Sequence, residues 1–403
     1  MHAHAMVSRV LGPCLTALHE KRRSALLKAT TGLLRGGVAS LSGIALNLGG
    51  GINLRHRLKS VDRLLGNEAL RQLRIDLYRR LAFCWLRDLP NLLVVVDWSD
   101  LTRNQRWHLL RASVVVEGRS VTLYEEAHPQ SRLNNGRVHR HFLARLASII
   151  PADCRPIIMT DAGFHADWYK MVGKHGWEFV GRVRGRNRIC CAGSEAWVPV
   201  RDLYPHAGSK AHDLGQCTYV RSNPVKVRAV LSKRPSSGRH QYTIYGSSRI
   251  GGSSAKNARR AREPWLLVSS VGLRHLAAQA IVGLYAQRMR IEQSFRDTKN
   301  LRWGLGLEVA QSRSGKRFEM LLLIVHLAAF VQRLIGAAAH QGQLALQFMA
   351  KRRTDRQEIS VMTLGRRILE IAPDQLRKLI PHLSITPLSQ QARFACQFNG
   401  VQG

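Results

Sequence analysis

The segment LLVVVDWSD, residues 92–100, decides the predicted fold. Five consecutive apolar residues, three of them Val, are typical of a buried central strand, and the run passes directly into Asp97. Strands are normally bounded by residues such as Gly, Asn or Pro, so a carboxylate held by a rigid strand is an unusual ending. We therefore predict that Asp97 stands at the carboxyl end of a central strand, where α/β sheets place their binding sites.

A second acid follows a second predicted strand in the same way. The segment RPIIMTDAGF supplies a short strand at 156–160 that ends at Asp161. Asp161 has an alternative role as the N-cap of a helix at 164–170. The strands and the helix predicted between the two acids are at 107–116, 120–125 and 138–150. This order predicts an α/β sheet with acids at the ends of its first and fourth strands.

The third acid lies on a predicted helix, YAQRMRIEQSFRDTK, at residues 285–299. The segment lacks Gly and Pro and is rich in helix formers. With about 100° of rotation per residue, a stripe about 60° wide collects four polar side chains. They are Tyr285, Arg288, Glu292 and Lys299. The alternative is a solvated helix face with i,i+4 pairs such as Glu292–Arg296.

Composition indicates a polyanionic partner. Lys and Arg number 62 against 26 Asp and Glu, a formal net charge of +36 spread along the whole chain. Nucleic acid is the natural partner for such a chain, and no separate basic amphipathic helix favours a membrane. The seven Cys residues show no C-x2-C spacing, which fits a reducing compartment and argues against a zinc ribbon.

The flanking regions differ in character. Residues 1–88 are predicted to be helical, and the helices at 40–48 and 54–65 are separated by the triple-Gly turn 49–51. This arrangement suggests a helix-turn-helix whose second helix would read DNA through Arg55, Arg57 and Lys59. An ordinary helical bundle with a charged face is an equal alternative. A β insertion is predicted within 174–275, and residues 233–262 are rich in cations. Its short strands are predicted at 178–184, 196–200, 217–221, 226–232, 241–245 and 265–270.

The three acids predict a metal-dependent chemistry. Asp97, Asp161 and Glu292 offer only oxygen ligands, which suit Mg²⁺ or Mn²⁺ rather than zinc. Two such ions stabilise the attacking and leaving oxygens of a displacement at phosphorus. Arg288 and Lys299 would hold flanking phosphates, and Tyr285 would donate a hydrogen bond to one. No Walker loop, G-x-S-x-G or H-E-x-x-H motif offers a rival site.

Three motifs together carry a resemblance to a known family. VVVDWSD, TDAGF and the spacing Tyr285-x2-Arg288-x3-Glu292-x6-Lys299 resemble the bacterial DDE transposases of the insertion-sequence-four family, close to the transposase of transposon ten. The segments LRASVVVEGRSVTLYE, EPWLLVSS and SVDRLLGN are also similar to it. The resemblance extends over residues 20–335.

The resemblance implies an RNase H-like mixed-sheet core interrupted by a β insertion, between helical N-terminal DNA-binding and C-terminal regions. It implies that Asp97, Asp161 and Glu292 bind two Mg²⁺ ions, which Mn²⁺ can replace. Trp265 matches a Trp that stacks on a base flipped out at the transposon end. The implied parts are 1–88, 89–173, 174–275, 276–335 and 336–403.

The resemblance further implies cut-and-paste movement of double-stranded DNA by a homodimer in the cytoplasm. One strand is nicked at each transposon end, the freed 3′-hydroxyl forms a hairpin, and the resolved end joins target DNA. Two alternatives stay open from the sequence. One is a metal-dependent endonuclease that cuts without joining, and the other is a DNA-binding protein without catalytic activity.

Overall fold

The computed structural model describes residues 3–185, 187–233, 263–348 and 359–398, and the chain forms two compact units. The first unit comprises Met1–Cys154 and Met289–Ala395, and the second comprises Arg155–Arg288 and Cys396–Gly403. The architecture is mixed α/β. The five-part division predicted from the sequence stays a prediction. The predicted strand at 241–245, and nearly all of the cation-rich segment 233–262, lie outside the described residues.

Three antiparallel strands form the sheet of the first unit, in the order β3-β2-β1. Their bounds are Asn91–Asp100 for β1, Trp107–Val116 for β2 and Arg119–Pro129 for β3. The register pairs Asp97 with Arg111 and Arg111 with Glu125. Residues directly opposite each other in antiparallel strands project from the same face of the sheet. The three charged side chains therefore form one row across the sheet.

The position predicted for Asp97 at a strand end is wrong. Strand β1 continues for three residues beyond Asp97 and stays paired with β2 as far as Asp100, which lies opposite His108. The sequence changes from apolar to polar after Val96, and the residues beyond Asp97 become partly exposed while the strand continues. Hydrogen bonds to a neighbouring strand hold the backbone extended even where the side chains reach the surface.

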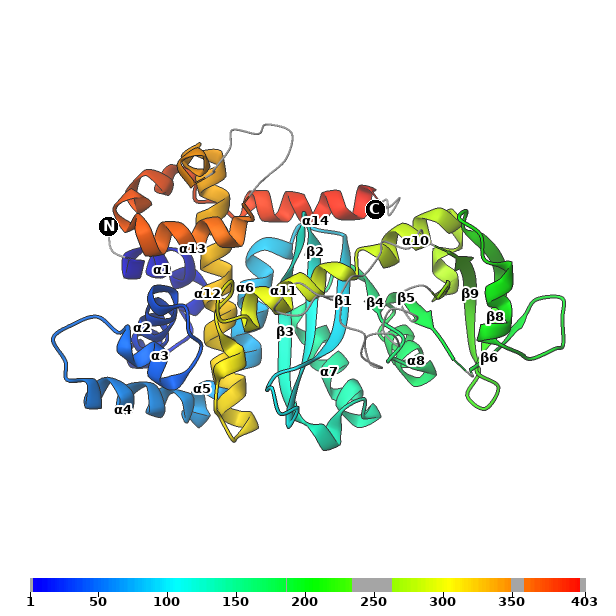
Figure 1. Cartoon of the computed structure of the whole chain (residues 1–403), viewed down its shortest axis with the longest axis horizontal. Coiled ribbons are helices and arrows are strands. Elements are labelled where there is room, and N and C mark those ends of the chain that lie inside the picture. The colour runs from blue at the N-terminus through cyan, green and yellow to red at the C-terminus, as the bar shows by residue number, and fades with distance from the viewer. Residues whose placement is uncertain (1–2, 186, 234–262, 349–358, 399–403) are drawn as a thin grey trace, which may run out of the picture. The chain divides into compact units, whose positions relative to one another are not determined.

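One long apolar helix, α12 (Gly315–Gln341), forms the core of the first unit. It packs against α2, α13 and β3, and Figure 1 shows it between the N-terminal helices and strands β1–β3. By length and composition it is the one described helix that could cross a membrane, but 89% of its most apolar window is buried inside the protein, as in the core helix of a globular protein. The apolar run 320–330 is too short to span a membrane and predicts a buried helix, which the structure confirms.

The other α-helices of the first unit surround α12 and the sheet. They are α1 (Ala3–Leu11), α2 (Glu20–Gly36), α3 (Leu41–Leu46), α4 (Leu54–Leu65), α5 (Glu68–Gln72), α6 (Arg74–Leu86), α7 (Gly136–Ile149), α11 (Met289–Lys299), α13 (Val361–Ile371) and α14 (Thr386–Phe398). Side-chain caps define several of them, because Ser40, Asn53, Asn67, Asn135 and Ser360 accept amide hydrogen bonds at their N-termini.

The described part of the second unit has seven strands in the order β4-β5-β10-β9-β8-β6-β7. The parallel pair β4 and β5 is joined through α8 (Ala166–Lys174), and α10 (Ala278–Ala286) packs on β5, β9 and β10. The strands are β4 (Arg155–Thr160), β5 (Glu178–Val183), β6 (Arg188–Cys191), β7 (Val198–Pro199), β8 (His212–Tyr219), β9 (Val225–Ser232) and β10 (Trp265–Ser269).

The single helix predicted at 285–299 is wrong. The structure has α10, which ends at Ala286, and α11, which begins at Met289, with a turn at Gln287 and Arg288. No residue in the segment is a helix breaker, so local propensity gives no signal for the break. The two helices belong to different units and pack on different strands, and tertiary packing overrides propensity. The continuous stripe of four polar side chains therefore does not form.

Candidate functional site

Helix α11 is fixed to the sheet of its own unit by a buried arginine. The Arg111 guanidinium donates to the hydroxyl groups of Ser294, at 3.1 Å, and Thr298, at 2.9 Å. The same group forms an ion pair with Glu125 at 2.6 Å, and both side chains are essentially inaccessible to solvent. Because Asp97 precedes Arg111 in the row across the sheet, its side chain projects toward the face that α11 covers.

Further bonds hold both ends of α11. Arg290 donates to the carbonyl of Val116 near the first turn, and Arg119 pairs with Asp297 at 3.0 Å near the last turn. The apolar face of the helix is buried through Ile291 and Phe295. These contacts leave α11 little freedom to slide or rotate, so the direction of its remaining side chains is determined by the sheet.

Two of the predicted site residues project from the same side of α11. Glu292 and Lys299 are seven residues apart, which is about two helical turns, and Glu292 is exposed. The Lys299 ammonium donates to the Ser99 hydroxyl at 2.6 Å and to the carbonyl of Asp100 at 3.1 Å. Ser99 and Asp97 are two residues apart on β1, so their side chains lie on the same face of the strand. Lys299 therefore contacts the strand that carries Asp97. The structure thus brings Asp97, Glu292 and Lys299 onto adjoining elements of one unit.

Burial shifts the pKa values of two charged side chains in this region. Burial, followed by the nearby charge of Arg111, lowers the pKa of Lys299. Burial raises the pKa of Glu125, and Arg111 opposes that increase. The Asp97 side chain is nearly buried, and its Oδ1 accepts a hydrogen bond from the Trp98 amide at 2.9 Å. The Trp98 indole in turn donates to His139 at 3.1 Å, which fixes the ring beside the strand.

Four further predicted site residues belong to the second unit, namely Asp161, Trp265, Tyr285 and Arg288. Asp161 follows β4, and its Oδ1 accepts from the Gly163 amide at 2.8 Å rather than from an amide of α8. The N-cap of α8 is His165, so the interpretation of Asp161 as a helix cap is not supported. Tyr285 is buried, with its ring centre 4.8 Å from that of Trp265 in an edge-on contact.

Arg288 lies in the turn between α10 and α11, with its guanidinium carbon 6.0 Å from the centre of the Tyr285 ring. Trp265 begins β10 and is half-buried. Trp265, Tyr285 and Arg288 therefore lie together on the second unit, which also carries Asp161, whereas Asp97, Glu292 and Lys299 belong to the first.

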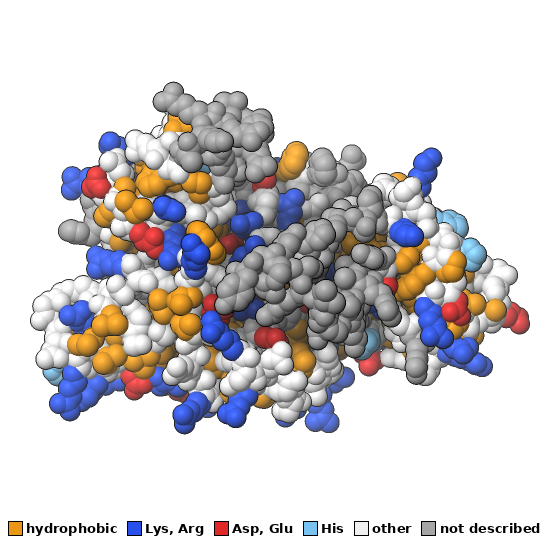
Figure 2. Space-filling view, viewed as in Figure 1, with side chains coloured by type: hydrophobic (Ala, Val, Ile, Leu, Met, Phe, Trp, Pro, Cys, Tyr) orange, Lys and Arg blue, Asp and Glu red, His pale blue; other side chains and the backbone are white. Residues whose placement is uncertain are grey.

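The predicted helices of the N-terminal region are confirmed, and α4 has the predicted bounds. Arg55 and Lys59 are exposed on α4, and Figure 2 shows Lys and Arg side chains along this edge of the first unit. Arg57 has a structural role, because it donates to the carbonyls of Ile52, at 2.7 Å, and Leu48, at 3.0 Å. It therefore holds the turn that precedes α4.

The predicted metal ligands fit the chemistry of a hard divalent cation. Asp97, Asp161 and Glu292 provide carboxylate oxygens only, the donors that Mg²⁺ and Mn²⁺ prefer. Within the described parts of the chain, no group of three or more His, Cys, Asp or Glu side chains is clustered closely enough to hold a metal ion. Asp97 and Glu292 lie in the first unit and Asp161 in the second.

Sequence analysis missed the residues that orient α11. Arg111 and Glu125 are opposite charges within two predicted strands, and that pattern is the signal that could have been used. Ser294 and Thr298 are four residues apart on α11, which places both hydroxyl groups on one face. Only the strand register shows that these four side chains meet.

The fold and the site together place the chain among mixed α/β proteins that carry acids on a sheet and on a helix packed against it. A family model described as "Transposase DDE domain" matches residues 89–331, more than half of the chain. The protein belongs to this family of DDE transposases, whose substrate is DNA. A comparison with curated proteins finds no match.

Proposed function

We propose that the protein is a transposase that moves an insertion sequence by a cut-and-paste mechanism within an RNase H-like core. One observation carries the proposal. Asp97, Arg111 and Glu125 form a row across the sheet. Arg111 binds the Ser294 and Thr298 hydroxyl groups of α11, in the helical turns that follow Glu292. This arrangement supports a common role for Asp97 and Glu292, and the family membership makes phosphoryl transfer on DNA the reaction.

We assign Asp97, Asp161 and Glu292 as the ligands of two divalent cations, Mg²⁺ or Mn²⁺. Bound there, the ions would activate the attacking oxygen and stabilise the leaving oxygen. Lys299 already uses its ammonium as a donor to neutral oxygens, and a phosphate oxygen is a stronger acceptor for it. Lys299 and Arg288 therefore bind the phosphates next to the scissile bond.

Tyr285 and Trp265 act together in this proposal. Their rings are already in contact, so Tyr285 supports the Trp265 ring in addition to offering a hydroxyl group to a phosphate. A supported indole is well suited to stack on an unpaired base, and such a stack offsets the free energy of unpairing it. The N-terminal helix α4 contributes phosphate contacts from Arg55 and Lys59.

The reaction proceeds in four steps at each end of the element. Water attacks one strand and frees a 3′-hydroxyl, which then attacks the opposite strand to give a hairpin. The hairpin is hydrolysed, and the regenerated 3′-hydroxyl attacks a target strand. Joining two ends requires that they be held together, so the active assembly is a homodimer on double-stranded DNA.

The test uses DNA that carries the inverted repeats flanking the gene, incubated with protein and Mg²⁺. Hairpin ends and joined target DNA are the expected products. Glu292→Gln should lower the rate of cleavage by at least about 10³-fold, the effect of losing several kcal/mol of metal-dependent stabilisation. Its control is Glu20→Gln, an exposed acid on α2, which should leave the rate unchanged.

The same assay separates the alternatives. Linear cuts without hairpins or joined products would show an endonuclease instead of a transposase. Normal cleavage by Glu292→Gln, or by Asp97→Asn and Asp161→Asn, would refute the assigned site. Asp153→Asn, an exposed Asp after α7, is the matched control for the two Asp variants.

A further inference from the structure

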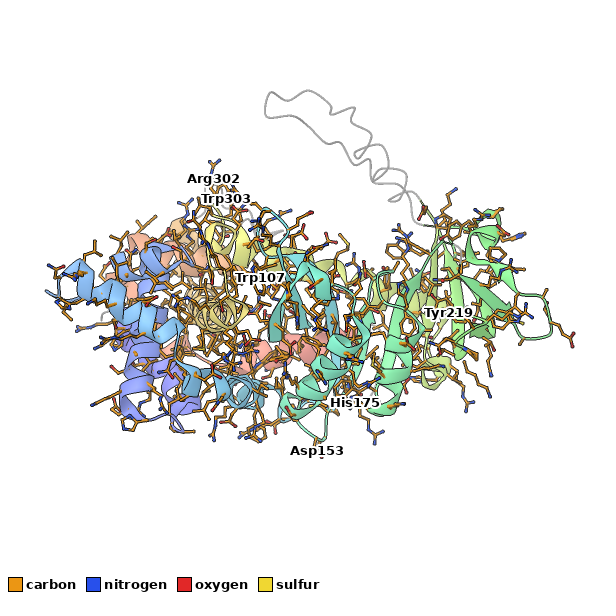
Figure 3. The ribbon with its side chains drawn as sticks, turned by 90° about the horizontal axis from the view of Figure 1, so that it is seen from below. Trp107, Asp153, His175, Tyr219, Arg302 and Trp303 are labelled. Carbon is orange, nitrogen blue, oxygen red and sulfur yellow. The ribbon has the colours of Figure 1, made fainter. Side chains whose placement is uncertain are left out.

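The turn that follows α11 presents a tryptophan to solvent. In residues 300–306, Trp303 is 53% exposed and Leu301 is 44% exposed. The Arg302 guanidinium carbon lies 4.8 Å from the centre of the Trp303 ring, and Figure 3 shows both labelled side chains at the margin of the protein. Large apolar side chains gathered on the surface mark a binding surface more often than isolated ones do.

This turn is held in one conformation. The backbone amide of Trp303 donates to the Asn300 side chain at 2.7 Å, and the amide of Leu305 donates to the Asp297 carbonyl at 2.9 Å. Gly304 packs directly on the backbone of α11, where a Cβ atom would collide with the Asp297 carbonyl. The backbone of Trp303 is therefore fixed before binding. A partner that contacts the ring would cost little conformational entropy of this turn.

A basic groove adjoins the turn. It has a volume of about 700 Å³ and lies between the loop after β1 and residues 308–313. Its cations are Arg103, Arg106 and Arg313, and the Trp107 ring forms part of its wall. Among the described residues that line it, Glu308 is the single acid, and this side chain links the groove to the turn because it accepts from the Leu301 amide at 3.1 Å. Arg103 is 75% exposed and only 3.7 Å from Glu308, so it can turn toward another anion.

The groove and the turn both adjoin Lys299, one of the candidate site residues. Lys299 donates to the Asp100 carbonyl, the last residue of β1, and the groove begins at Thr102. On the other side, the turn begins directly after Lys299. All these residues belong to the first unit. A strand of DNA whose phosphate is bound by Lys299 would thus have basic side chains and an aromatic ring immediately beside it.

We propose that the groove and the Trp303 turn bind an unpaired DNA strand adjacent to the reacting phosphate. The arginines contact its phosphates, and Trp303 stacks on one exposed base. The strand must be unpaired there because a duplex hides the faces of its bases from a side chain, whereas a single strand offers them. Three arginines against one acid favour a polyanion over a protein partner. This assignment of Trp303 rests on the proposed function.

The test compares the affinity of the full-length protein for two fluorescent DNAs of one sequence. One is fully paired and the other has a short single-stranded gap. Trp303→Ala should weaken binding of the gapped DNA by roughly 5- to 150-fold, the effect of losing one aromatic–base stack. It should change binding of the paired DNA by less than about twofold. Trp303→Phe should keep most of the affinity. The control is Phe83→Ala, a half-exposed aromatic residue on α6.

The outcomes separate this inference from the proposed function. If the wild-type protein joins DNA but Trp303→Ala binds both DNAs as the wild type does, the inference is wrong and the function stands. If Trp303→Ala loses gapped DNA selectively while the wild-type protein joins no DNA, the inference stands and the function is wrong. Equal weakening for paired and gapped DNA, or no preference of Trp303→Phe over Trp303→Ala, also overturns stacking. Circular dichroism verifies that each variant is folded.

Discussion

Removing the arginine that joins α11 to the sheet should destabilise the first unit strongly. In Arg111→Met, Glu125 keeps its buried position but loses its ion-pair partner, and Ser294 and Thr298 lose their donor. Breaking a fully buried ion pair by removing one partner costs about 3–5 kcal/mol. Total stabilities are about 5–15 kcal/mol, so this single change removes a large share. Urea denaturation followed by circular dichroism measures it.

The pH dependence of that loss tests its cause. Burial already raises the pKa of Glu125, and without Arg111 it should rise further. At low pH the unpaired Glu125 takes up a proton and no longer carries a buried charge. The stability lost in Arg111→Met should therefore become smaller as the pH falls from 8 toward 5. Buried carboxyl groups have pKa values of about 5 to 9, so Glu125 should take up its proton in this range.

A double variant and a surface control complete the test. Arg111→Met with Glu125→Leu removes both charges and should be less destabilised than the sum of the single variants, by about 2 kcal/mol or more. Arg103→Met breaks the exposed pair with Glu308 and should cost no more than about 1 kcal/mol. The reasoning fails if Arg111→Met costs less than about 1 kcal/mol, or if the single effects simply add.

Two further predictions concern acid stability and DNA binding. Burial opposes ionisation of Glu126, but His128 and Arg145 together lower its pKa to about 2. The ionised side chain therefore contributes on the order of 3 kcal/mol to the stability of the fold. This contribution is present above the unfolded pKa of about 4.5 and is lost as the pH falls toward 2. Glu126→Gln should therefore be clearly less stable than the wild type at neutral pH and nearly equal to it near pH 2; a constant difference would contradict this. DNA affinity measured by fluorescence anisotropy should fall steeply with salt, and replacing Arg55 and Lys59 by Gln should reduce the slope of log affinity against log salt by about 2. An unchanged slope would show that α4 does not contact DNA.

Much of the fold could be predicted because its strands and helices carry strong local patterns. The apolar runs before Asp97 and Asp161 identified β1 and β4, and the triple-Gly turn 49–51 separated α4 from the helix before it. Strand β6 was missed, since it is a four-residue strand at Arg188–Cys191 that only partly faces a core. The predicted strand at 196–200 is reduced to Val198–Pro199 and passes into a 3-10 helix.

The candidate site could be predicted in part. The three acids could be identified because each is a carboxylate beside apolar residues or among cations. The break in the helix that carries Glu292 could not be predicted, because the break at Gln287 depends on what each half packs against. Arg57 shows the same limit in another form. Its charge suggested a DNA contact, whereas its guanidinium is occupied by backbone carbonyls that only the folded turn brings within reach. Contacts between residues distant in sequence were the information that local patterns lacked.

The discontinuous course of the chain through the first unit has a consequence for its synthesis. Helix α12 fills the core against which α2 and β3 pack, yet it follows them in the chain after the whole of the second unit. The ribosome must add about 135 residues between Cys154 and Met289, which takes on the order of 7–27 s at typical elongation rates. During that interval the nascent N-terminal helices and strands lack the helix that fills their apolar core. The first unit can therefore complete its core only late in translation, after α12 has been added.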